Sequence, residues 1–168
     1  MDTLLGPLMD DLRACVCAAL EDTLGGSVSC FCSLLPGQNA PADWCTCKGT
    51  ASCGMGWVRL DNLYPSGERF PAQDGTTKAS CASVLAAVLE VGVYRCQPVP
   101  DRQGGPPAAA DQTQAALVQA DDALALHRAI GCCTAITSRP HLLGRYQPRD
   151  GGGCGGGAWQ VTVQLLRR

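Results

Sequence analysis

Residues 159–165, Trp159-Gln160-Val161-Thr162-Val163-Gln164-Leu165, alternate strictly between large apolar and polar side chains. This alternation predicts a half-buried strand, because successive side chains of a strand point to opposite faces of its sheet. We expect the core-facing side chains to be Trp159, Val161, Val163 and Leu165, and the opposite face to carry Gln160, Thr162 and Gln164. Because this strand must pair with segments that precede it, the chain should form a sheet with helices packed against it.

Two helices are predicted upstream of this strand. Apolar residues at helical spacing indicate a first helix over Pro7–Leu24, with Gly25 and Gly26 as the stop. A second helix is expected over Ala108–Ile130, and Gly131 ends it. We expect its buried stripe to be Ala116, Leu117, Ala120, Ala123, Leu124 and Ile130, with Gln112, Gln119 and Asp122 facing water.

The clearest remaining strand lies within Ser83–Cys96, and shorter ones are expected at Ser29–Leu34 and Trp57–Leu60. Between them we expect an irregular cysteine-rich loop over 27–56, a proline- and glycine-rich connection over 97–107 and a glycine-rich loop over 151–157. The sequence therefore predicts a single α+β domain over residues 1–168, in which two main helices pack on one face of a mainly antiparallel sheet.

Charge and hydropathy narrow the classes of partner. The formal net charge is -2, the sequence pI is about 5.6 and the basic residues are scattered. A nucleic-acid or membrane-surface binder needs clustered cations, so we expect neither sequence-specific nucleic-acid binding nor membrane binding. An apolar run long enough to span a bilayer and an N-terminal secretory signal are also absent from the sequence. We therefore expect synthesis in a cytoplasm.

The chain has twelve cysteines, several of them in Cys-x-Cys pairs. Structural disulfides are the favoured interpretation, with plain buried thiols as an alternative. The disulfide candidates are Cys30, Cys32, Cys45, Cys47, Cys53, Cys81, Cys96 and Cys154. A second alternative is a zinc site made by Cys30, Cys45, Cys47 and Cys53, although structural zinc sites usually use Cys-x2-Cys spacing. Cys15 and Cys17 diverge on the first helix, so we expect them to be packing residues.

The sequence offers little for catalysis. Redox enzymes place a Cys-x-x-Cys motif at a helix N-terminus, and none is present. His127 and His141 are expected to be a packed helical side chain and a solvated loop side chain, and Asp121 and Asp122 to lie on a solvated face. Glu90 lies on the polar side of a strand, facing solvent or a partner subunit. We therefore expect no enzyme activity, catalytic residue, cofactor or resident metal.

Five blocks of sequence carry a resemblance to a known group of proteins. They are Leu34-Leu35-Pro36-Gly37, Ala42-Asp43-Trp44-Cys45, Gly56-Trp57-Val58-Arg59-Leu60, Leu89-Glu90-Val91-Gly92-Val93-Tyr94-Arg95-Cys96, and Gly153-Cys154-Gly155-Gly156 before Trp159. In this order the chain resembles head-to-tail connector proteins of long-tailed actinobacterial phages, the tail terminators in particular. The Cys-x-Cys pairs depart from that group, which does not require them.

The resemblance implies a structural virion protein at the head-tail junction, assembled in the host cytoplasm. It would be a homo-oligomer, usually a hexameric ring, with the tail tube protein on one side and a head-completion or stopper protein on the other. The alternatives are another neck component such as the head-closure stopper, a small zinc-binding interaction module, and a thiol oxidoreductase as the weakest.

Overall fold

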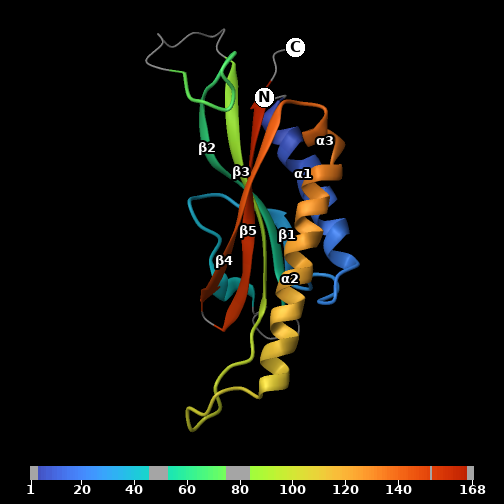
Figure 1. Ribbon diagram of the computed structural model, residues 1–168, viewed down its shortest axis with the longest axis vertical. Coiled ribbons are helices and arrows are strands. Elements are labelled where there is room, and N and C mark those ends of the chain that lie inside the picture. The colour runs from blue at the N-terminus through green and yellow to red at the C-terminus, as the bar shows by residue number, and fades with distance from the viewer. Residues whose placement is uncertain (1–3, 46–52, 75–83, 152, 166–168) are drawn as a thin grey trace.

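The computed structural model describes residues 4–45, 53–74, 84–151 and 153–165. It is an α+β single-domain fold with a five-stranded mixed sheet (Figure 1). The helices are α1 (Leu5–Glu21), α2 (Ala109–Cys132), α3 (Thr134–Thr137) and a 3-10 turn, η1 (Ala42–Cys45). The strands are β1 (Phe31–Leu34), β2 (Met55–Pro65), β3 (Leu85–Cys96), β4 (His141–Gly151) and β5 (Cys154–Leu165). The predicted α+β class is confirmed.

The strand order in the sheet is β1-β2-β3-β5-β4. β1 runs parallel to β2, whereas the β2/β3, β3/β5 and β5/β4 pairs are antiparallel. The C-terminal strand pairs along its whole length with β3, from Leu85 opposite Leu165 to Cys96 opposite Cys154. β5 is therefore paired on both sides, which satisfies its backbone hydrogen bonds, and its apolar side chains pack in one core with residues of the helices.

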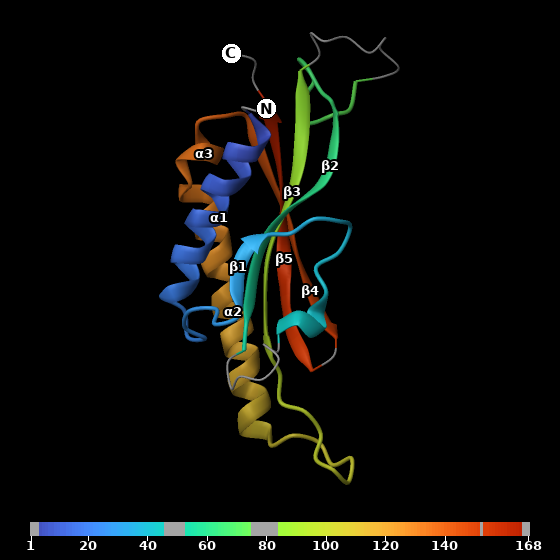
Figure 2. The ribbon, with the colours of Figure 1, turned by 180° about the vertical axis from the view of Figure 1, so that it is seen from behind.

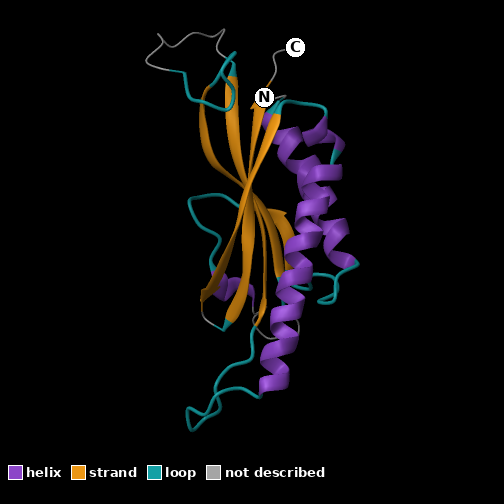
Figure 3. Cartoon of the chain, viewed as in Figure 1, coloured by secondary structure: helices purple, strands orange, loops and turns teal. Residues whose placement is uncertain are grey.

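The helices α1, α2 and α3 lie together on one side of the sheet, as Figures 2 and 3 show. Val161, Val163 and Leu165 are buried beneath them, and the indole N–H of Trp159 donates a hydrogen bond to the carbonyl of Ala123 in α2 at 2.9 Å. α1 buries Leu8, Leu12, Val16 and Leu20, at the spacing expected of an amphipathic helix. These side chains form the main hydrophobic core with those of β3, β5 and the last turns of α2.

A second, smaller core lies around Trp57 and Tyr94, whose ring centroids are 4.6 Å apart. η1 and the residues before it contribute to this core and lie on the side of the sheet away from the helices (Figure 2). Its buried members are Ala40, Cys45, Met55, Trp57, Tyr94, Cys154 and Ala158.

Two expectations about the C-terminal region are wrong. Residues 151–157 are mostly strand, because β4 ends at Gly151 and β5 begins at Cys154. A Cβ on Gly156 would collide with the backbone carbonyl of Val93, so the glycines allow close approach of strands. His141 begins β4 and does not lie in a loop.

The expected buried stripe of α2 is wrong except at Ile130, which is buried. The buried residues of this helix are Asp122, Ala125, Leu126, Ala129 and Ile130, whereas Leu117 and Leu124 are 53% and 61% exposed. These buried residues have helical spacing, but they lie on a face rotated about the helix axis from the predicted face, and this face includes Asp122. The first turns of α2 extend past the end of the sheet, together with the connection that precedes them (Figure 1).

Among the described residues, none of the helices combines the length and apolar character needed to span a membrane.

Candidate functional site

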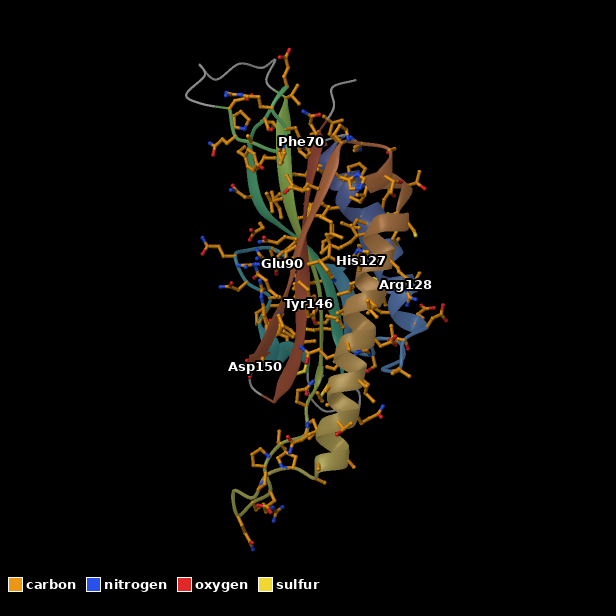
Figure 4. All side chains as sticks on the ribbon, in the orientation of Figure 1. Phe70, Glu90, His127, Arg128, Tyr146 and Asp150 are labelled. Atoms are coloured by element: carbon orange, nitrogen blue, oxygen red, sulfur yellow. A yellow bond between two sulfur atoms is a disulfide. The ribbon has the colours of Figure 1, made fainter. Side chains whose placement is uncertain are left out.

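A cluster of charged side chains is buried on the sheet. Glu90 of β3 is fully buried, and Figure 4 labels it near the middle of the sheet. Arg59 of β2 donates to both of its carboxylate oxygens, from Nε at 2.7 Å and from Nη2 at 2.8 Å. Arg149 of β4 donates two more hydrogen bonds at 3.0 and 2.5 Å, and Trp57 Nε1 donates another at 3.2 Å. Glu90 thus faces neither solvent nor a partner, which corrects the expectation from the sequence.

The charge cluster keeps Glu90 ionised. Burial by itself would raise the pKa of Glu90, but the hydrogen bonds from Arg59 and Arg149 outweigh it and hold the pKa of this carboxyl below its ordinary value. The bond to Glu90 in turn raises the pKa of Arg59. Two guanidinium groups around one carboxylate leave one positive charge, and Asp61 balances it formally by accepting from Arg59 Nη2 at 2.8 Å.

The cluster links four strands of the sheet. Arg59 and Asp61 belong to β2, Glu90 to β3 and Arg149 to β4. Gln160 of β5 donates to Asp61 at 3.1 Å. Because every charged member has an opposite partner, the arrangement supports a fixed sheet geometry, and removal of one member would leave buried charge uncompensated.

A second buried ion pair joins the sheet to the helices. Arg95 at the end of β3 forms a two-pronged contact with Asp122 of α2, at 2.9 and 3.0 Å. The same guanidinium donates to the carbonyl of Gly25 at 3.0 Å and to Thr23 Oγ1 at 3.1 Å. Arg95 thereby connects β3, α2 and the segment that follows α1. The expectation of a solvated Asp122 is wrong because a residue 27 positions away supplies its counter-charge.

Disulfides connect distant segments of the chain. The pairs are Cys15–Cys133, Cys17–Cys32, Cys45–Cys154 and Cys53–Cys96, with Cα separations of 5.8 to 6.3 Å. Cys30 is also disulfide-bonded, whereas Cys132 is free and exposed. Cys47 and Cys81 lie outside the described residues. The expectation that Cys15 and Cys17 only pack is wrong, since their divergence on α1 directs them to different partners.

Two of these disulfides touch each other. Cys45 Sγ lies 3.7 Å from Cys53 Sγ, and the sulfurs of Cys45, Cys53 and Cys96 all lie within 4.8 Å of one another. Cys154 adjoins this group through its bond to Cys45. Of the four cysteines expected for the alternative zinc site, the structure thus brings Cys45 and Cys53 together, while Cys30 lies 3.1 Å from the carbonyl of Cys45.

The two histidines lie on different elements. His127, labelled in Figure 4, lies on α2. The centroid of its ring is 5.3 Å from that of Trp159. His141 is exposed on β4, where its Nδ1 lies 2.9 Å from the carbonyl of Arg139. His127 is exposed, so this ring contact is the only part of the expected packing that the structure shows, and the exposed His141 is a surface group on a strand.

Large apolar side chains are exposed on the outside of the helix layer. Leu117 and Leu124 lie two turns apart on one face of α2, and Leu24 beside them is 64% exposed. The backbone N–H of Leu24 donates to Asp121 of α2 at 2.7 Å, which fixes it next to this helix. We call Leu24, Leu117 and Leu124 the α2 patch. A cluster of this kind on a monomer's surface is typical of a protein interface.

The edge of the sheet at β4 is a second candidate surface. β4 is the last strand in the order, and its exposed side chains include His141 and Leu142, the latter 52% exposed. The pairing with β5 is irregular between Leu143 and Tyr146, and Pro148 lacks a backbone donor. Both features limit the pairing of a further strand with this edge. The part of β4 that could still pair with another chain therefore lies near His141.

Compared with known proteins, the chain matches no protein-family model and no curated protein sequence.

Proposed function

We propose that this chain is a structural virion protein of a long-tailed actinobacterial phage, a tail terminator that forms a ring at the head-tail junction. One face of the ring caps the tail tube, and the other docks a head-completion or stopper protein. In this proposal the subunit has two main helices packed on one face of a mainly antiparallel sheet. The ring, usually of six copies, is assembled in the host cytoplasm and transforms no molecule.

The observation that carries the proposal is the α2 patch. Its three leucines are each more than half exposed and lie next to one another on α2 and on the segment that follows α1. Exposure of such side chains on adjoining segments costs free energy that burial against a partner would recover. Assembly with other copies of the chain would bury this patch in an interface.

A closed ring needs two different surfaces on each copy, because each subunit contacts its neighbours head to tail. The α2 patch lies on the helix layer, and the β4 edge with Leu142 lies on the sheet. In the proposed ring, the α2 patch of one copy packs against the β4 edge of the next. This pairing supplies the heterologous contact that a ring requires.

The positions of the resemblance blocks also support the proposal. Cys45, Trp57, Tyr94 and Cys154 come from four different blocks, and they meet in the second core. Segments that are far apart in sequence therefore build one local structure, as expected if the blocks reflect a shared fold and not chance similarity.

The amount of helix favours a terminator over a head-closure stopper. A stopper of the barrel-like kind would have less helix, whereas α1 and α2 have 17 and 24 residues here. These helices also form the layer that presents the α2 patch. The terminator is therefore the preferred neck component.

The proposal can be tested in a phage that carries this chain. Disruption of its gene should give filled heads and separate tails, with tube lengths no longer uniform. Complementation with the intact gene should restore joined particles. Normal virions in the absence of the protein would overturn the proposed role.

A further inference from the structure

We propose that Cys45, Cys53, Cys96 and Cys154 form a tetrahedral zinc site when their two disulfides are reduced. The site does not depend on the proposed ring. It differs from the set expected from the sequence, since Cys96 and Cys154 replace Cys30 and Cys47.

The sulfur geometry already resembles that of a zinc tetrathiolate. Zinc binds thiolate sulfur at about 2.3 Å, so two sulfurs on a tetrahedral zinc are separated by about 3.8 Å. Cys45 and Cys53 are not bonded to each other, and their sulfurs are 3.7 Å apart. The Cys96 sulfur lies within 4.8 Å of both. Reduction lets each bonded pair separate by side-chain rotation to the distance that a shared zinc requires.

The backbone holds the four cysteines near one another without help from the sulfur bonds. Cys96 and Cys154 are directly opposite on the antiparallel strands β3 and β5. Cys45 ends η1, and its carbonyl accepts a hydrogen bond from the N–H of Gly54 at 2.9 Å, next to Cys53. The thiols are therefore positioned by the strand ladder and the loop contact once the disulfides open.

Access to the two bridges differs, and this sets the order of reduction. Cys96 is exposed and Cys53 half-buried, whereas Cys45 and Cys154 are 0% and 1% exposed. A dithiol reductant therefore reaches Cys53–Cys96 first. It donates two electrons and two protons, forms two thiols on the protein and leaves as a cyclic disulfide.

The buried bridge then opens by internal exchange. The Cys53 thiolate attacks Cys45 Sγ at 3.7 Å, the Cys45–Cys53 bond forms, and Cys154 leaves as a thiolate. A second dithiol molecule reduces the new Cys45–Cys53 bond to two thiols. Zinc binding displaces the remaining protons from the four sulfurs. Ribosomal synthesis takes place in a reducing cytosol, so the thiol form precedes the bridged one.

The test compares oxidised and reduced wild-type protein. Protein reduced by a phosphine and freed of oxygen should bind one zinc ion per chain by elemental analysis, and oxidised protein should bind none. Cobalt(II) in place of zinc should give the strong visible absorption of a tetrahedral tetrathiolate. Reduced protein that binds no zinc, folded or unfolded, overturns the proposal.

Alkylation identifies the ligands. Zinc should protect the accessible thiols Cys53 and Cys96 from iodoacetamide relative to reduced, metal-free protein, whereas the exposed Cys132 should react in both states, as peptide mass spectrometry can measure. Cys154→Ser should weaken zinc binding at least tenfold, and Cys132→Ser should leave it unchanged. Protection of a different set of cysteines, or equal zinc affinity in both variants, contradicts the assignment.

Discussion

The indole of Trp57 lies directly over Gly92, its partner across the β2/β3 pair. A Cβ at position 92 would overlap the indole ring, so this glycine makes the space that Trp57 occupies in the second core. The two residues belong to separate blocks of the resemblance. Their fit shows that the second core depends on shape at single positions.

Gly92→Ala is therefore expected to destabilise the protein by about 1–3 kcal/mol, the usual cost of overpacking a filled core. Chemical denaturation measures this change. Gly131→Ala is the matched control, because no atom lies within 4 Å of a Cβ at that helical position. The control should be neutral or gain up to about 1 kcal/mol, since alanine favours helix over glycine. Equal effects at the two positions would contradict the packing argument.

Glu90→Gln is expected to destabilise the folded state by about 3–5 kcal/mol at neutral pH, because it leaves two arginines facing a neutral group. Urea unfolding should detect this loss. The exposed pair of Asp10 and Arg13 provides a control, and Asp10→Asn should change stability by less than about 0.5 kcal/mol.

The effect of Glu90 should depend on pH in a defined direction. Its pKa is lower in the folded protein than its ordinary value of 4.5. The carboxylate therefore contributes full stability above that value, and the contribution is lost as the pH falls through the lower folded pKa. The stability difference between wild type and Glu90→Gln should narrow below pH 4.5, and a difference that widens on acidification would refute the assignment.

Arg95 and Asp122 should behave as a coupled pair. Asp122→Ala alone is expected to cost about 3–5 kcal/mol, since Arg95 would remain buried without a counter-charge. The double variant Arg95→Met with Asp122→Leu should be more stable than Asp122→Ala, because both charges are then removed. Thermal or urea unfolding of Arg95→Met, Asp122→Leu and their double variant completes the cycle. Simple additivity of the single changes would show that the pair is not coupled.

The α2 patch can be tested without loss of the fold. Because Leu117 and Leu124 are exposed, Leu117→Glu with Leu124→Glu should leave the unfolding free energy within about 1 kcal/mol of wild type. For the proposed six-copy ring, the same variant should shift the mass measured by light scattering from six times the 17.5 kDa chain mass to that of the single chain. Leu63→Glu, on β2, is a control that should retain the assembled mass. An unchanged mass in the α2 variant would exclude this surface from the interface.

Local patterns predicted some elements because burial there follows a regular period. The alternation over residues 159–165 identifies β5, and Leu8, Leu12, Val16 and Leu20 give α1 its buried stripe. β4 was missed because Gly144, the irregular pairing near it and Pro148 interrupt its alternation. The run of glycines before β5 likewise lacks the side chains on which a strand pattern depends.

Long-range contacts were beyond such patterns. The face of α2 that meets the sheet differs from the predicted one because it includes Asp122, which pairs with Arg95. A prediction from the spacing of apolar residues places an aspartate on the solvated face. Glu90 is buried because arginines from two other strands surround it. Disulfide pairing depends on which segments fold together, so Cys15 and Cys17 were assigned to packing although they bond to Cys133 and Cys32.

Negative-stain imaging of purified protein mixed with tail tubes tests the central claim most directly. The account predicts rings of the protein at tube ends, with uncapped ends when the variant Leu117→Glu with Leu124→Glu replaces the wild type. Tubes that remain bare at both ends in the presence of excess wild-type protein would contradict it.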